Sequence, residues 1–237
     1  MFDKHSSINT WQKDRMSKEN LSEKLFIDWC LKHQFQCLRI STNHTKTPDF
    51  KVTKSDITLY AEVKEIIANE EEKRALEQLN TKGWSGAFGE EPGKTVREKI
   101  KDAYPQLKHY TVTNKVPGVL VLYNNTGMIG NGRIDAYNVL IGMFGTQTIP
   151  VYVSNSPETP PIIGKDYFGR NKSVWAERKT YLSAIIVMYT NIENTLCSSI
   201  YHNPFAKHKI SPEFLNLSDS FQYSVNLENL IWENVKL

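Results

Sequence analysis

The chain has 237 residues, of which 40% are hydrophobic and 23% charged, and this composition excludes a chain that is disordered throughout. Its formal net charge of +3 permits nucleic-acid binding but does not require it. The 3 cysteines have no regular spacing, which argues against a disulfide framework or a zinc knuckle and favours a reducing, cytoplasmic setting. The polar N-terminal stretch does not have the pattern of a secretory signal, and the longest apolar runs are too short to span a bilayer, so we expect no membrane association.

The predicted elements begin after a flexible arm over residues 1–16, which has no periodicity. A helix is expected to begin at Ser17 or Ser22, because either hydroxyl can cap it, and to end near residue 33. A strand over 35–40 follows, and two strands over 48–52 and 57–64 flank a turn, which together predict a hairpin. The helix has an apolar stripe at helical spacing, formed by Leu21, Leu25, Phe26 and Trp29.

The middle of the chain predicts two helices, over 70–79 and 94–110, separated by a glycine-rich loop at 82–93. In this loop we expect Trp84 and Phe88 to fold back on the core rather than to stack on nucleic-acid bases. Pro105 is expected to kink the second helix. The apolar stripe of that helix consists of Val96, Ile100, Ala103 and Leu107. A continuous apolar run at 118–123 is typical of a buried central strand.

The rest of the chain predicts a helix over 134–144, a strand over 148–153, a loop over 154–172, a buried strand over 182–190 and an irregular tail after Ser199. The order of helices and strands predicts an α/β fold with a mixed central sheet flanked by helices. We expect a core over 17–190 and a C-terminal extension over 191–237 packed on it. His202 and His208 have no third ligand nearby and are interpreted as structural, and Asn203-Pro204 is interpreted as a turn.

The residues that point to chemistry lie on the predicted hairpin. Glu62 and Lys64 are two apart in a strand and share one face, whereas Ala61 and Val63 point to the other, and the hairpin brings Asp49 alongside Glu62. Oxygen ligands from Asp49, Glu62 and the Val63 carbonyl suit Mg²⁺, for which Mn²⁺ is expected to substitute. Such a metal activates a water molecule and neutralises phosphate charge, and Lys64 can orient the hydroxide or stabilise the transition state.

The sequence Pro48-Asp49, followed by Glu62-Val63-Lys64, resembles the PD-(D/E)xK motif of the restriction-endonuclease-like superfamily. The resemblance covers residues 17–123 and implies an αβββαβ core with the catalytic hairpin at its centre. It also implies metal-dependent hydrolysis of phosphodiester bonds, most simply of DNA, in restriction, repair or defence.

The resemblance extends to both sides of the motif. It implies a glutamate on the first helix that points at the metal, for which Glu23 is the best candidate and Glu19 the second. It also implies a later helix whose polar residues approach the site, and Arg97, Lys101 and Gln106 occupy these places.

The helix over 94–110 has a basic side that a nucleic-acid backbone can follow. Its members are Arg97, Lys99, Lys101 and Lys108, and Gln106 is grouped with them as a nucleic-acid-binding residue. The alternative is a solvated helix face in which these cations are interspersed with acids. The same alternative holds for a second basic group, which consists of Lys165, Arg170, Lys172, Arg178 and Lys179.

Alternatives to the nuclease hypothesis stay open from the sequence. The hairpin charges can be ordinary surface groups, with Lys64 paired to Glu62 or Glu65 in solvent, and Glu23 can be a solvated helix residue. The whole chain can be a catalytically silent nucleic-acid-binding or interaction module with the same fold, or a nuclease that cuts RNA. A two-fold homodimer is the simplest arrangement for cutting two strands.

Overall fold

The structure of the chain is a computed structural model that describes residues 20–41, 46–86, 90–126, 131–156, 158–191, 193–217 and 219–235, without the side chains of residues 131 and 132. The expected arm at 1–16, the alternative helix start at Ser17, and Glu19 and Phe88 lie outside these residues. Within the described part of the chain, no helix has the length and apolar character needed to cross a membrane.

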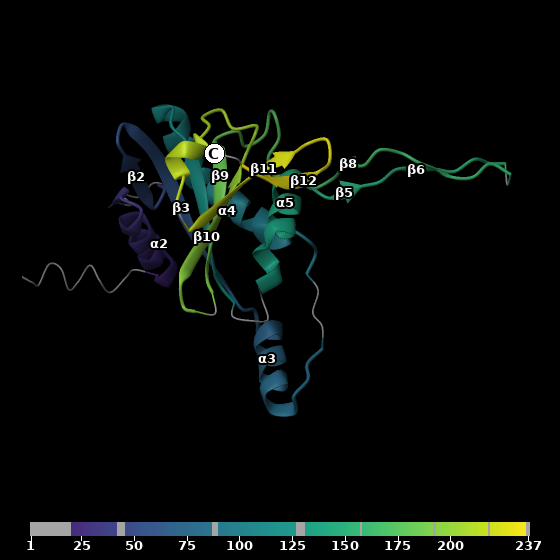
Figure 1. Cartoon of the computed structure of the whole chain (residues 1–237), viewed down its shortest axis with the longest axis horizontal. Helices are drawn as coiled ribbons and strands as arrows, with labels where there is room; N and C mark the ends of the chain where they lie inside the picture. Colours follow the sequence, from purple (N-terminus) through teal and green to yellow (C-terminus); the bar gives the residue numbers. More distant parts are fainter. Residues whose placement is uncertain are drawn as a thin grey trace, which may run out of the picture.

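A mixed sheet of eight strands forms the centre of the molecule (Figure 1). In spatial order the strands are β1 (Gln36–Arg39), β2 (Phe50–Lys54), β3 (Ile57–Ile67), β4 (Gly118–Asn125), β9 (Leu182–Thr190), β10 (Leu196–His202), β11 (Ser220–Asn226) and β12 (Ile231–Asn234). Strands β3, β4 and β9 are parallel, whereas β1, β2 and β3 pair antiparallel. The expected α/β fold with a mixed central sheet flanked by helices is confirmed at this level.

Helices cover both faces of the sheet. On one face lies α2 (Leu21–Lys32), whose buried side chains Phe26 and Trp29 pack against the β2–β3 hairpin and the central strands. On the other face lie α4 (Lys94–Asn114) and α5 (Ala136–Phe144), and the predicted stripe of α4 is buried as expected. Leu21, which we expected in the stripe of α2, is 47% exposed because it begins the helix beyond the edge of the core.

Strand β3 alternates between these two covered faces. Leu59, Ala61 and Val63 belong to the apolar cluster on the α2 side, whereas Tyr60 and Ile66 belong to the cluster on the α4 side. Side chains two apart in a strand share a face, so Glu62 and Lys64 point toward α4. The two charged residues therefore lie in a row whose other members are core residues.

Three sequence predictions are wrong. The tail after Ser199 is regular, because β10, β11 and β12 extend the sheet. Serine and tyrosine recur in β10 and β11, and β12 has only 4 residues. Residues 148–153 do not form one strand, because Pro150 has no N–H for a ladder and divides it into β5 (Gln147–Thr148) and β6 (Val151–Tyr152). The helix expected to end at residue 110 continues as α4 to Asn114, with Pro105 inside it.

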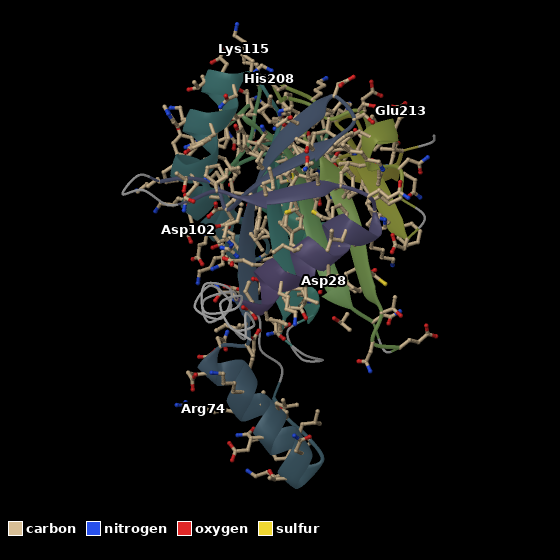
Figure 2. All side chains as sticks on the ribbon, turned by 90° about the vertical axis from the view of Figure 1, so that its left-hand side faces the viewer. Asp28, Arg74, Asp102, Lys115, His208 and Glu213 are labelled. Carbon is tan, nitrogen blue, oxygen red and sulfur yellow. The ribbon has the colours of Figure 1, made fainter. Side chains whose placement is uncertain are left out.

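Two segments stand out from this body. Strands β5 and β6 pair with β8 (Tyr167–Phe168) and β7 (Ile162–Ile163) in a long ribbon (Figure 1), so that part of the expected loop over 154–172 is extended and paired. Helix α3 (Glu70–Lys82), which carries Arg74, projects on another side (Figure 2). Trp84, beyond its end, is 65% exposed, so the expectation that it folds back on the core is wrong.

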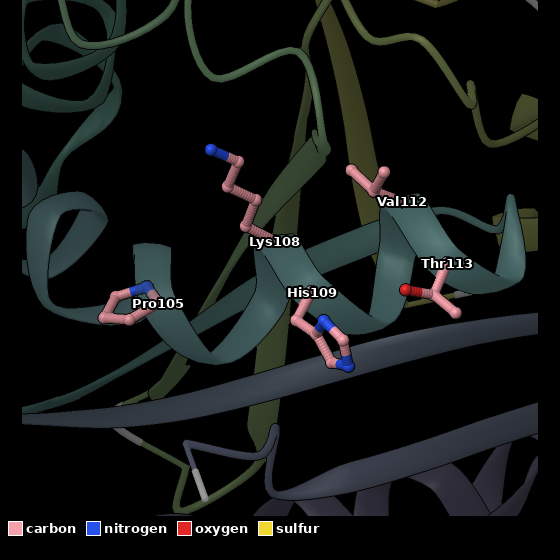
Figure 3. A pocket seen from close by; sticks show the side chains of 5 residues that line it. All are labelled: Pro105, Lys108, His109, Val112 and Thr113. Carbon is pink, nitrogen blue, oxygen red and sulfur yellow. The ribbon is translucent and has the colours of Figure 1, made fainter.

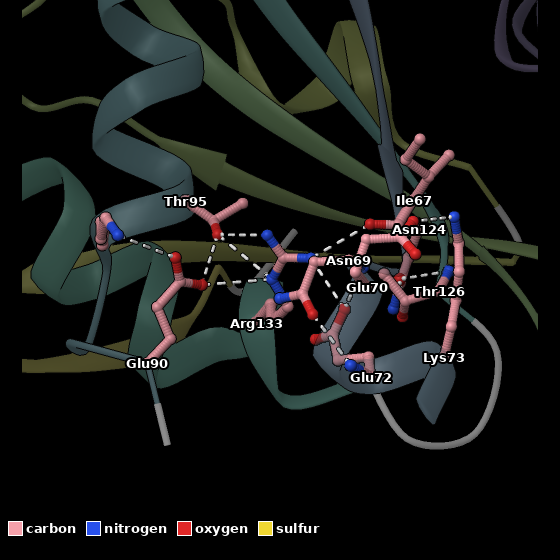
Figure 4. Close-up of polar contacts among 11 residues, drawn as sticks. Ile67, Asn69, Glu70, Glu72, Lys73, Glu90, Thr95, Asn124, Thr126 and Arg133 are labelled. Atoms are coloured by element: carbon pink, nitrogen blue, oxygen red, sulfur yellow. Dashed lines mark hydrogen bonds and ion pairs between the residues drawn. The ribbon is translucent and has the colours of Figure 1, made fainter. Parts of the chain in front are cut away.

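A polar network anchors the base of α3 to the core (Figure 4). The Arg133 guanidinium donates to the Glu72 carboxylate at 3.1 Å and to the Ile67 carbonyl at 3.1 Å, and it also reaches Glu90 and Thr95. One arginine thus joins the end of β3, the start of α3 and the start of α4. Glu72 is buried, and Arg133 is the cation paired with it.

We expect Arg133→Ala to lower the free energy of unfolding by about 2–3 kcal/mol, because it leaves the buried Glu72 carboxylate without its cation. The measurement is urea denaturation. Lys73→Ala is the matched control, since its pair with Glu70 is fully exposed and should contribute little to stability. Equal losses in the two variants would contradict the anchoring role.

Candidate active site

Asp49 lies where β2 begins and is held by both neighbouring strands. Its carbonyl accepts from the Ile40 amide at 2.9 Å, and its Oδ2 accepts from the Val63 amide at 2.8 Å. The ladder of β2 and β3 ends at the pair of Phe50 and Ala61, so Val63 has no β2 residue opposite it. The Asp49 side chain therefore supplies the missing acceptor, and this contact fixes it beside the middle of β3.

Glu62 is a charged residue that is almost completely buried. It is only 2% exposed, and its Oε1 accepts from Lys64 Nζ at 2.6 Å. Its other oxygen, Oε2, is buried and has no hydrogen-bond partner among the described atoms. Burial, and after it the charge of Asp49, raise the pKa of Glu62 to about 7. Burial also raises the pKa of Asp49, against the opposing effects of the Val63 amide and of Lys64.

Glu23 approaches the same place from the first turn of α2. Its charge acts on Asp49, where it favours the protonated form. The Glu23 carboxylate is paired with Arg39 at 2.5 Å, so it is not a solvated helix residue. Arg39 also lies 5.0 Å from the centre of the Phe50 ring. The sequence reasoning missed Arg39, although its position at the end of the strand before Asp49 was a usable signal.

These residues offer two carboxylates and one backbone carbonyl to a cation. The N–H and C=O of one residue point to the same side of a strand, and in β3 the odd-numbered residues direct both groups toward β2. The Val63 carbonyl is therefore on the Asp49 side. No three His, Cys, Asp or Glu side chains in the described ranges are grouped as metal ligands. An oxygen set completed by a carbonyl and waters is what Mg²⁺ commonly uses, and the unpartnered Glu62 Oε2 fits such an ion.

The expected nucleic-acid-binding residues of α4 do not form one group. Successive helix residues turn by about 100°, so Lys99 and Gln106 lie on one side, and Lys101 lies on nearly the opposite side with Lys108. Lys99 and Gln106 are half-buried, whereas Lys101 and Lys108 are exposed. Arg97 is paired with Glu91 at 2.5 Å and is tied to the segment just before the helix.

Gln106 lies on nearly the same side of α4 as Tyr110, which packs against β3. One turn after it, Tyr110 packs edge-on against Tyr60, with ring centroids 5.2 Å apart. Helix α4 ends at Asn114, close to the start of β4 at Gly118, so α4 and β4 run in opposite directions. Because β4 is parallel to β3, α4 is also antiparallel to β3. Gln106 is about 6 Å along the helix from Tyr110, and Glu62 is about 7 Å along β3 from Tyr60. The Gln106 amide is therefore level with Glu62, and its Oε1 is also buried without a partner.

A shallow hollow of about 280 Å³ lies elsewhere, along the C-terminal half of α4 (Figure 3). It is lined by Pro105, Lys108, His109, Val112 and Thr113. No residue of the candidate site contributes to it. Among the remaining predictions, His202 is buried and its Nε2 pairs with Gln222 at 2.8 Å, which fits a structural role.

Comparison of the chain with protein-family models, with curated proteins and with solved structures gives no match in any of the three. The class of this protein is therefore argued from the geometry of its own residues.

Proposed function

We propose that this protein is a metal-dependent nuclease whose active site consists of Asp49, Glu62 and Lys64. The single observation that carries the proposal is the Glu62 carboxylate, which is 2% exposed and has one oxygen without a partner next to a second carboxylate. Buried polar atoms in proteins almost always have partners, so such an atom indicates a water or an ion that completes the site.

The rival interpretation, a hairpin with ordinary surface charges, accounts poorly for this arrangement. Lys64 does pair with Glu62, but the pair lies between α4 and β3 rather than in solvent. Placing one cation beside two carboxylates in a covered row leaves a net negative charge, and burying it is costly. A divalent cation would remove that cost, and it gives the cluster a chemical purpose.

The residues present fit magnesium, and Asp49, Glu62 and the Val63 carbonyl would hold it, with Mn²⁺ as a substitute. When bound, the ion supplies an activated water and neutralises charge on a phosphate. Lys64 holds its ammonium 2.6 Å from Glu62, where it can donate to the attacking oxygen or to a phosphate oxygen. The Val63 amide donates to the Asp49 carboxylate and so orients it, and Arg39 pairs with the Glu23 carboxylate.

The element order supports the proposal further. Helix α2, strands β1, β2 and β3, helix α4 and strand β4 follow one another in the order expected of a restriction-endonuclease-like core, with α3 interposed between β3 and α4. DNA is the proposed substrate. Two copies related by a two-fold axis are the simplest way to cut both strands.

The proposal is tested by incubating the protein with supercoiled plasmid, linear duplex, single-stranded DNA, branched DNA and RNA, each with Mg²⁺, Mn²⁺ or EDTA. We expect cutting with either metal, none with EDTA, and loss of at least about a hundredfold in Lys64→Ala. Lys51→Ala, a half-buried lysine of β2, is the control. Lys64→Ala that cuts as fast as the control would contradict the assignment.

A catalytically silent module with the same fold is the second candidate. It predicts binding to one of these substrates without turnover and without dependence on metal. Cutting confined to RNA would keep the site and change the substrate.

A further inference from the structure

A second group of cations lies on the outer side of α4, away from Glu62. The Lys108 ammonium is 5.0 Å from the centre of the Tyr104 ring, and the Lys179 ammonium is 5.9 Å from the same ring. Tyr104 in turn packs edge-on against Tyr181, at 5.1 Å between centroids. One helix and one loop that are far apart in sequence thus bring their lysines over a single tyrosine.

The loop before β9 adds further positive charge to this group. Arg178 donates to the Lys172 carbonyl at 3.2 Å, and Lys172 lies over the ring of Trp175 at 3.9 Å. Burial, and after it the charges of Arg178 and Lys101, lower the pKa of Lys179. The five cations therefore form one basic patch: Lys101, Lys108, Lys172, Arg178 and Lys179.

In the described part of the chain the members of the basic patch are not paired with acidic side chains, although Glu98 and Glu177 lie in the same segments. Across the described ranges, none of its five members makes an ion pair, whereas Arg97 and Arg133 nearby are both paired with glutamates. Asp102, on the exposed side of α4 (Figure 2), follows Lys101 and is turned about 100° away from it. Lys179 is also held in the left-handed region, at φ 53°, which is uncommon for a residue with a side chain. Like charges gathered without partners favour an external anion.

We propose that the basic patch binds the phosphate backbone of a nucleic acid, with Lys101, Arg178 and Lys179 as its main contacts. The proposal rests on the proposed function, because it names a second contact for the same substrate. From Lys101 to Lys108 the patch extends about 10 Å along α4, which is the rise of about three base pairs of duplex. This length suits a polymer of phosphates better than one small anion. Lys108 also lines the hollow on the C-terminal half of α4 (Figure 3).

The test measures binding in EDTA, so that cleavage does not interfere, by fluorescence anisotropy of a labelled 30-base-pair duplex and a 30-nucleotide single strand at several salt concentrations. The test variant is Lys101→Gln, Arg178→Gln and Lys179→Gln together. The control is Lys73→Gln, Arg74→Gln and Lys82→Gln together, which removes as many charges from the exposed surface of α3. We expect the patch variant to bind at least about tenfold more weakly than the parent, with the slope of log K against log salt reduced by about 2–3.

The control should stay within about threefold of the parent, because its charges lie outside the patch. An unchanged slope in the patch variant, or an equal loss in the control, would overturn the proposal. So would the absence of salt-dependent binding to either strand type, which would point to an acidic protein instead. This outcome is separate from that of the nuclease test. Binding through the patch without metal-dependent cutting would support the patch and contradict the nuclease proposal. Metal-dependent cutting by a protein that binds equally well without the patch charges would support the nuclease and contradict the patch.

Discussion

Asp49→Asn is expected to reduce metal-dependent cleavage by at least about a hundredfold while leaving the fold intact. The amide keeps an oxygen that can accept from the Val63 N–H, so the contact between β2 and β3 is preserved. It removes the negative charge that a divalent cation needs from this position. The measurement is the initial rate of plasmid or oligonucleotide cleavage, with the melting temperature recorded in parallel.

The matched control for Asp49→Asn is Asp56→Asn, in the exposed turn of the same hairpin. This variant carries the same chemical change about one strand length away from the site and should cleave like the parent. A folded Asp49→Asn protein that cleaves at the parent's rate would show that Asp49 is not part of the active site. Equal losses in both variants would show that the hairpin, and not the carboxylate, is what matters.

Glu62→Gln is expected to abolish a loss of stability that the parent shows, in the absence of metal, as the pH rises from about 4.5 to about 7. The pKa of Glu62 is raised from 4.5 to about 7 in the folded protein. Between these values the folded state holds a proton that the unfolded state releases, so the parent loses stability as the pH rises through this window. The loss is on the order of 3 kcal/mol, and it is complete above pH 7. Glutamine has no charge to bury and should not show it.

This second prediction is checked by urea denaturation in EDTA at pH values from 4 to 8. The parent and Glu62→Gln should have similar free energies of unfolding near pH 4, and the variant should be the more stable at pH 8. Glu65→Gln, three residues further along β3 and half-buried, is the control and should follow the parent. If the free energies of unfolding of the parent and of Glu62→Gln change with pH in the same way, burial does not raise the pKa of the Glu62 carboxylate.

The hairpin that carries the site was predictable, because its residues are local in sequence. Period-two patterning predicts two strands joined by a turn. In the structure the turn consists of Ser55 and Asp56, and the resulting pairing of Phe50 with Ala61 puts Asp49 beside Glu62. The buried stripe of α4 and the central strands were predictable for the same reason. By contrast, the burial of Glu62 was not visible in the sequence, because it depends on α4 covering the β3 row from a position some 40 residues later.

Contacts between distant segments account for the other misses. The pairing of Glu23 with Arg39 requires the packing angle of α2 on the hairpin, which no local pattern encodes. The same holds for Lys108 and Lys179, which belong to two separate basic groups in the sequence but lie over the same ring, that of Tyr104. The last three strands were missed because the serines and tyrosines of β10 and β11 blur the alternation of apolar and polar residues, and because β12 has only 4 residues.

The central claim is that Asp49 and Glu62 form a divalent-cation site, and thermal melting with and without metal tests it without any substrate. At pH 8, millimolar Mg²⁺ or Mn²⁺ should raise the melting temperature of the parent, by an amount that grows with metal concentration. The rise should be smaller at pH 5.5, where Glu62 is protonated, and absent in Glu62→Gln. A parent that does not respond to either metal, or a Glu62→Gln variant that responds as the parent does, would contradict the assignment.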